Sequence, residues 1–180
     1  MRSCITFLLI MFVVIALNDS LYAQDCTHTY YSVQNDILGD DIAPGDTVCL
    51  MAGNWKYILL KNIHGTEDKP VFIRNYGPVN IQNQENNPGY GIKFDRCSHI
   101  KLSGATNEQF YYGIKILEIL NGTGISIDNL SSDIELENIE ISNTSIAGIY
   151  AKTEPDYFQD CSFIATREKF LMENISIHDC

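Results

Sequence analysis

The chain has none of the short motifs that usually mark an enzyme. Its 180 residues contain no H-E-x-x-H, no G-x-S-x-G, no phosphate-binding G-x-x-x-x-G-K and no EF-hand loop. These absences exclude the metal, nucleophile and nucleotide sites that such motifs identify. A function must therefore come from outward-facing residues that meet on one face of the fold.

Basic residues are also scarce. Twelve Lys and Arg stand against 23 Asp and Glu, which gives a formal net charge of −11. A protein of this charge repels phosphate backbones, so we expect no binding to nucleic acid. An acidic polysaccharide would likewise need a local basic patch or bridging cations in order to bind.

No two cysteines have the C-x-x-C spacing of zinc ribbons or thioredoxin-like sites. Five cysteines follow residue 23, namely Cys26, Cys49, Cys97, Cys161 and Cys180. An odd number leaves one of them without a partner in this chain, and the sequence does not give the pairing.

Long apolar runs are missing except at the N-terminus. Residues 1–23 combine Arg2, an apolar run from Ile5 to Leu17, and Ala23 at the expected cleavage position. This order is typical of a secretory signal peptide, with an uncleaved anchor as the alternative. We therefore expect a secreted protein, extracellular or at the cell surface, whose mature part is soluble and has no transmembrane anchor.

What the sequence does contain is a repeat of nine short alternating segments. The three segments of the first column begin with Gly-Ile, at positions 91, 124 and 148. Written in order, the segments fall into three columns of apolar pairs. The first column has Ile92/Phe94, Ile125/Ile127 and Ile149/Ala151; the second has Ile100/Leu102, Ile134/Leu136 and Phe170/Met172; the third has Ile114/Ile116, Ile139/Ile141 and Ile175/Ile177.

Alternation places each apolar pair on one face of a strand, and strands this short are stable only when stacked. The segments therefore predict an all-β fold, a parallel β-helix with three short strands in each coil of the solenoid. Residue types that tolerate left-handed backbone angles occupy the corners: Gly104, Asn129, Asn138, Asn143 and Asn174. Insertions are expected at 105–112 and 153–168. An antiparallel sandwich is the alternative.

Residues 45–81 contain "GDTV", Trp55 after "AGN", "GTEDKPV" and "GPVNI". This segment resembles the opening coils of the pectate-lyase-like right-handed β-helix superfamily, including its alginate-lyase and chondroitinase-B-like group. The resemblance implies a right-handed β-helix over residues 47–180, and residues 24–46 could form its N-terminal cap. The catalytic residues of the resembling lyases lie in later coils, and no position here matches their motif.

The outward positions of the first column supply the catalytic candidates. A lyase acting on a uronate polymer needs a base and a cation that stabilises the developing charge. Lys93, Arg96, Asp128 and Lys152 could supply these groups, and Asp128 with Asp95 could hold Ca²⁺ or act as the carboxylate pair of a glycoside hydrolase. An ordinary solvated face is the alternative interpretation.

Other candidates lie outside that set. Tyr150, Tyr157 and His178 are predicted to bind substrate, although the four histidines lack metal-ligand spacing. A second possible calcium site is formed by Asp40, Asp41 and Asp46.

We therefore expect a secreted β-helix protein that binds or degrades extracellular polysaccharide. If active, it would be a lyase, or else a glycoside hydrolase; the alternative is a non-catalytic surface or adhesion protein. The final strand, placed in the third column, ends at Cys180 without a following corner. This ending predicts a C-terminally truncated fragment whose catalytic coils are missing.

Overall fold

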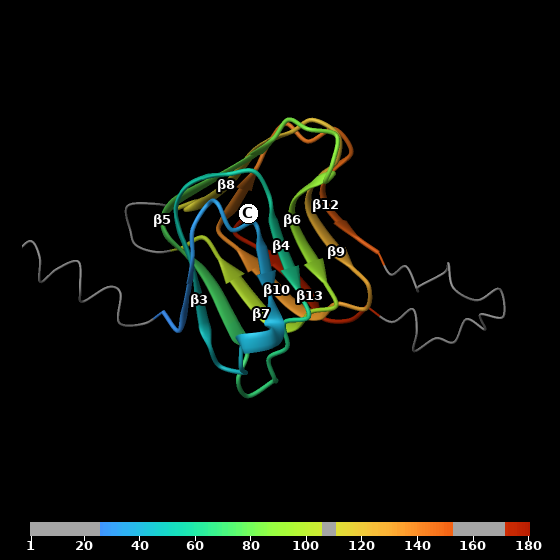
Figure 1. The fold of residues 1–180 in the computed structure, drawn as a ribbon. Helices are drawn as coiled ribbons and strands as arrows, with labels where there is room; N and C mark the ends of the chain where they lie inside the picture. Colours follow the sequence, from blue (N-terminus) through green and yellow to red (C-terminus); the bar gives the residue numbers. More distant parts are fainter. Residues whose placement is uncertain (1–25, 106–110, 153–171) are drawn as a thin grey trace, which may run out of the picture.

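The computed structural model describes residues 26–105, 111–152 and 172–180, which consist mostly of β-strands in two parallel sheets (Figure 1). The predicted signal peptide, the 153–168 insertion and Tyr157 lie outside the described residues.

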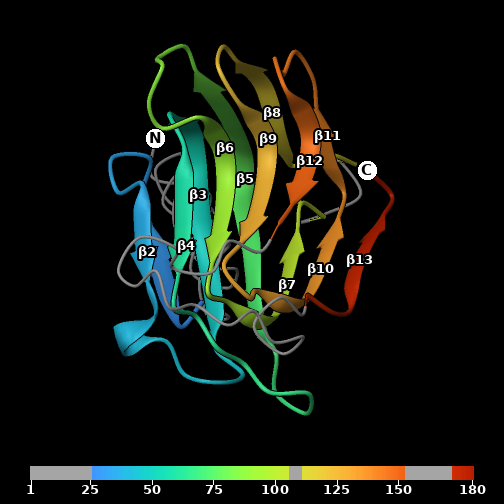
Figure 2. The ribbon, with the colours of Figure 1, turned by 90° about the vertical axis from the view of Figure 1, so that its right-hand side faces the viewer.

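The smaller sheet has five strands and corresponds to the first predicted column. In spatial order it contains β12 (Ala147–Ala151), β9 (Thr123–Asp128), β6 (Tyr90–Asp95), β4 (Ile58–Lys61) and β2 (Asp36–Leu38). Figure 2 shows β6, β9 and β12 side by side, with β5 and β8 beyond them.

The larger sheet has eight strands and divides into two branches. One branch runs through β1 (His28–Tyr30), β3 (Thr47–Trp55), β5 (Val71–Asn83), β7 (Ser98–Ser103), β10 (Ser132–Glu137) and β13 (Ile175–His178). The other branch adds β8 (Ile114–Ile119) and β11 (Ile139–Ile141) to the second half of β5. The long strands β3 and β5 therefore contribute to both branches.

The smaller sheet and the two branches of the larger sheet make three surfaces. The chain passes through them in a fixed order: β6, β7 and β8 lie on the three surfaces in turn, and β9, β10 and β11 then follow in the same order. Every strand pair in the described residues is parallel. The antiparallel sandwich is thereby excluded, and the arrangement is compatible with a parallel β-helix.

Rows of isoleucine fill the core, as the alternation predicts. Ile58, Ile92, Ile125 and Ile149 are successive partners across four strands, and the first three are fully buried. Burying an aliphatic side chain of this size contributes roughly 1.5–3 kcal/mol. The strand register thus confirms the first-column pairs as neighbours. It also confirms the first two pairs of the second column and the first two pairs of the third column.

The placement of the last strand in the third column is wrong. Ile175 and Ile177 are the partners of Ile134 and Leu136, which belong to the second column. Both columns have the same alternation, so the sequence could not distinguish them. Met172, predicted in the second column, precedes the strand and packs against the core, while Phe170 lies outside the described residues.

The corners use left-handed backbone at the four predicted asparagines, whose φ angles lie between 52° and 54°. Gly104 is different, because it is not among the glycines with positive φ. A Cβ atom there would lie 2.1 Å from the carbonyl oxygen of Asn138, so this glycine permits the close approach of two backbones.

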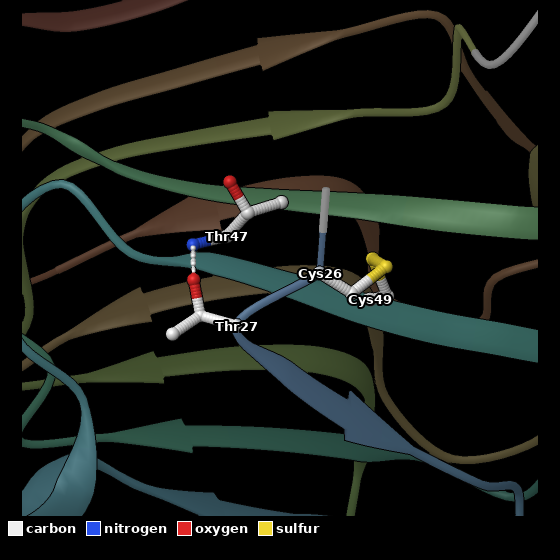
Figure 3. Close-up of a disulfide and its surroundings, with 4 residues drawn as sticks. All are labelled: Cys26, Thr27, Thr47 and Cys49. Atoms are coloured by element: carbon white, nitrogen blue, oxygen red, sulfur yellow. Dashed lines mark hydrogen bonds between the residues drawn. A yellow bond between two sulfur atoms is a disulfide. The ribbon is translucent and has the colours of Figure 1, made fainter. Parts of the chain in front are cut away.

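Residues 26–46, predicted to form a cap, continue both sheets with β1 and β2 and include the 3₁₀ helix η2 (Gly39–Asp41). A disulfide joins Cys26 to Cys49 on β3. Beside it, Thr47 donates its backbone N–H to the hydroxyl of Thr27 over 3.0 Å (Figure 3). The disulfide and this hydrogen bond together attach the first strand to the sheet.

Candidate functional site

Two of the predicted catalytic residues, Lys93 and Asp128, lie on the outward face of the five-stranded sheet, because their neighbours in sequence point inward. Arg96 and Lys152 directly follow β6 and β12. One outward row crosses all five strands as Tyr150, Ser126, Lys93, Leu59 and Asp36. The next row contains Asp128, Asp95, Lys61 and Leu38. Parallel pairing thus makes Asp95 and Asp128 direct neighbours, and they are called the aspartate pair below.

The aspartate pair is buried, with 8% of Asp95 and 5% of Asp128 exposed. The alternative interpretation, an ordinary solvated face, is therefore wrong for these two side chains. Buried carboxylates require hydrogen-bond partners. Asp128 accepts a hydrogen bond from the Ser126 hydroxyl at 2.8 Å, and Asp95 accepts one from the Asn129 amide at 2.6 Å.

Each member of the aspartate pair also contacts a cation. The Lys93 ammonium lies 2.8 Å from Asp128, and the Arg96 guanidinium lies 3.3 Å from Asp95. Arg96 donates a second hydrogen bond to Asn62 at 3.1 Å. Asn62, Arg96 and Asn129 all have φ between 52° and 55°, so these bonds connect corners of successive turns of the chain.

These contacts decide what the aspartate pair can do. The contact between Lys93 and Asp128 would have to break before the Lys93 amine could act on a substrate. Both oxygens of Asp128 and both oxygens of Asp95 already contact a donor or a cation, and a Ca²⁺ ion would have to displace these contacts, so the pair does not fit Ca²⁺. The geometry is that of a buried network that links neighbouring strands.

Two tyrosines adjoin the aspartate pair. The rings of Tyr57 and Tyr90 meet edge to face with centroids 5.7 Å apart, and Lys93 lies 5.7 Å from the Tyr90 centroid. Burial, followed by the proximity of the Tyr57 hydroxyl and of the Asp36 carboxylate, raises the pKa of Tyr90 to about 12. Its hydroxyl therefore stays protonated at neutral pH. Tyr90 was not among the predicted site residues, although it immediately precedes a Gly-Ile segment.

Tyr150 lies on β12, and Lys152 directly follows this strand. The Lys152 ammonium is 5.9 Å from the centroid of the Tyr150 ring, and 44% of Tyr150 is exposed. Tyr150 follows Ser126 in the outward row, so its exposed ring adjoins the aspartate-pair strands.

The second predicted calcium site, of Asp40, Asp41 and Asp46, does not assemble in the described part of the chain. Asp46 accepts hydrogen bonds from the Ala43 backbone N–H and from His28, at 2.8 and 2.9 Å. The hydrogen bond from Ala43, and then that from His28, lower the pKa of Asp46. Asp40 and Asp41 belong to η2 instead.

His178 lies far from these candidates in the fold, on the outward face of β13. Its Nε2 atom is 3.2 Å from Glu135 and 3.9 Å from Glu137, both on the neighbouring strand β10. These three residues, called the histidine cluster below, have ligand atoms that all lie within 4.8 Å of one another. The cluster was not predicted, because Glu137 and His178 are 41 positions apart in the sequence.

A groove of about 200 Å³ borders the histidine cluster and shares Glu135 with it. Ile100, Ile134 and Pro70 give it apolar surface. Its polar lining comes from Thr66, Glu67, His99, Lys101, Asp133, Glu135, Asn174 and Ser176. Lys101 lies 2.7 Å from Glu135, and Asn174 donates a 2.6 Å hydrogen bond to Asp133.

Comparisons with protein-family models, with curated proteins and with solved structures give no match to this chain. Within the described residues, no helix has the length and apolar character needed to cross a bilayer.

Proposed function

We propose that this chain is a secreted protein that binds extracellular polysaccharide in the groove over β7, β10 and β13. The single observation that carries this proposal is the polar lining of the groove. Sugars present a dense set of hydroxyl donors and acceptors, and Asn174, Ser176 and Asp133 offer complementary groups in one hollow.

An acidic polysaccharide is the favoured ligand class. The protein as a whole is acidic, but Lys101 and His99 place positive or proton-donating groups within the groove. Lys101 lies 2.7 Å from Glu135, so a uronate carboxylate would bind by taking the place of Glu135 beside this ammonium.

Binding without catalysis accounts better for the site than lyase or hydrolase activity. Lys93 is ion-paired with Asp128, and Arg96 is ion-paired with Asp95. The Lys152 ammonium lies over the Tyr150 ring. A β-elimination needs a base that can accept a proton, and these cations do not offer one. We therefore favour the surface or adhesion role over degradation.

Two observations support the rest of the proposal. The three-surface order of the parallel strands supports a right-handed parallel β-helix of the pectate-lyase-like superfamily, as the opening motifs imply. The Cys26–Cys49 disulfide supports export, because such bonds persist mainly in oxidising compartments.

The test is affinity electrophoresis of the chain through gels that contain alginate, pectin, chondroitin or neutral dextran. We expect retardation by one of the acidic polymers and none by dextran. The same polymers are then incubated with the chain, with and without Ca²⁺, while the ultraviolet absorbance of unsaturated product is followed. Binding without product supports the proposal, whereas product formation would favour a lyase.

A matched pair of lysine variants locates the binding. Lys101 and Lys115 each lie 2.7 Å from a glutamate on a neighbouring strand, and 45% and 40% of their side chains are exposed. Only Lys101 lines the groove. Lys101→Ala should therefore weaken binding about tenfold, the value of one charge-assisted contact, while Lys115→Ala should not. Equal effects of the two variants would contradict the assignment of the groove.

A further inference from the structure

Parallel pairing of β10 with β13 assembles a set of metal-ligand types that the polysaccharide proposal does not use. Glu135 and Glu137 are two residues apart on β10, so both side chains point outward. His178 is the direct partner of Glu137 in the register of the two strands. An imidazole and two carboxylates therefore converge from two adjacent strands.

The distances within the histidine cluster are close to those of a metal site. Ligands of a tetrahedral zinc ion at 2.0–2.1 Å lie about 3.3 Å from one another. The Nε2 atom of His178 is 3.2 Å from one Glu135 oxygen and 3.9 Å from one Glu137 oxygen. Small side-chain rotations would bring all three atoms to bonding distance around one ion.

The surroundings of the cluster orient its ligands. Asp179 lies 3.1 Å from Nδ1 of His178, so when Nδ1 donates its proton to this carboxylate, Nε2 is the nitrogen that would ligate an ion beside the two glutamates. Lys101 contacts the second oxygen of Glu135 at 2.7 Å, which leaves the first oxygen for the ion.

Glu137 has the longest contact in the cluster. Its side chain is 33% exposed, and one of its carboxylate oxygens lies 3.9 Å from Nε2 of His178, too far for a hydrogen bond. A metal ion between these two atoms would replace this long contact with two bonds.

We propose that Glu135, Glu137 and His178 bind one divalent transition-metal ion, for which Zn²⁺ is best suited. The imidazole ligand favours zinc over calcium or magnesium, which prefer oxygen ligands alone. Three protein ligands leave the fourth tetrahedral position open to water or to a ligand carboxylate. This proposal does not depend on polysaccharide binding.

The test is isothermal titration of the full chain with Zn²⁺ after treatment with a chelator, together with the visible spectrum of the Co²⁺-substituted protein. We expect one equivalent of Zn²⁺ and a cobalt spectrum without a thiolate charge-transfer band. His178→Ala and Glu137→Gln should each weaken Zn²⁺ binding at least tenfold. Circular dichroism without metal should match that of the unsubstituted chain, because both side chains are on the surface.

Two control variants exclude other sites. Cys180→Ser removes the exposed free thiol two residues from His178, and His64→Ala removes a histidine that contacts Ser98 rather than a carboxylate. Neither should change Zn²⁺ affinity. The proposal is overturned if the chain binds no Zn²⁺, if binding survives His178→Ala, or if it is lost in Cys180→Ser.

Discussion

At the scale of single residues, the environment of His178 sets its protonation. The hydrogen bond to Asp179, and then that to Glu135, raise the pKa of His178 above its ordinary value of 6.5. The groups that face the ring are Glu135 and Glu137 from β10 and Asp179 from its own strand end. All three are acidic, so each favours the imidazolium form.

This raised pKa predicts a pH dependence of definite sign. A group whose folded-state pKa exceeds its unfolded value stabilises the fold fully below the unfolded pKa, and this contribution disappears as the pH rises through the folded pKa. In metal-free protein, NMR titration of His178 should give a midpoint above 6.5. Asp179→Asn should lower the midpoint, whereas Glu140→Gln, on the distant strand β11, should leave it unchanged. A midpoint at or below 6.5 in the unsubstituted chain would contradict the prediction.

At the scale of elements, each strand is short and depends on its neighbours for burial. β9 is the most enclosed strand, because all six of its residues are buried. Its inward isoleucines join the core rows, and its outward Ser126 and Asp128 join the buried polar network. Packing on both faces makes this strand sensitive to changes of volume.

Ile125→Ala should therefore destabilise the protein by about 2–5 kcal/mol, since Ile125 is fully buried and truncation leaves a cavity. The matched change Ile146→Ala, at a side chain that is 72% exposed, should alter stability by no more than about 0.5 kcal/mol. Urea unfolding followed by circular dichroism measures both values. Similar urea midpoints for the two variants would show that the row is not the core.

Corners are the second kind of element that fixes the fold. Asn129 combines a left-handed φ of 52° with the hydrogen bond to Asp95, so its backbone and its side chain serve the same turn. Asn174 does the same against Asp133 in the other sheet. An asparagine is suited to both tasks because its short amide tolerates left-handed angles and donates hydrogen bonds.

At the scale of the whole molecule, the stacked strands contact chiefly the strand before and the strand after them. Stability in such an arrangement is approximately a sum of neighbour terms. The Cys26–Cys49 disulfide strengthens the contact between the first two strands of the larger sheet, because it connects the residues just before β1 to β3.

Replacing both cysteines, Cys26→Ser with Cys49→Ser, should lower the free energy of unfolding by about 3 kcal/mol, the chain-entropy value for a loop of this length. Hydrogen exchange should accelerate at His28–Tyr30 and remain slow in β9. The control Cys180→Ser removes a thiol without removing a disulfide and should have no such effect. If hydrogen exchange accelerated equally along the whole chain, stability would not be a sum of contacts between neighbouring strands.

The candidate sites show where prediction from sequence succeeded. The adjacency of Asp95 and Asp128 was predicted because their Gly-Ile segments share one column, and the register confirms it. The burial of the aspartate pair was not predicted, because alternation shows which way a side chain points and not what covers it.

The sequence by itself determined the strands, the inward isoleucine rows and the asparagine corners, because alternation and left-handed tolerance are local properties of the chain. Only the tertiary structure decided the partner of the last strand. In the predicted third column, His178 would have lain beside Ser142; the actual register places it beside Glu137. Strand pairing across 41 residues depends on how the intervening chain returns, and no local pattern encodes it.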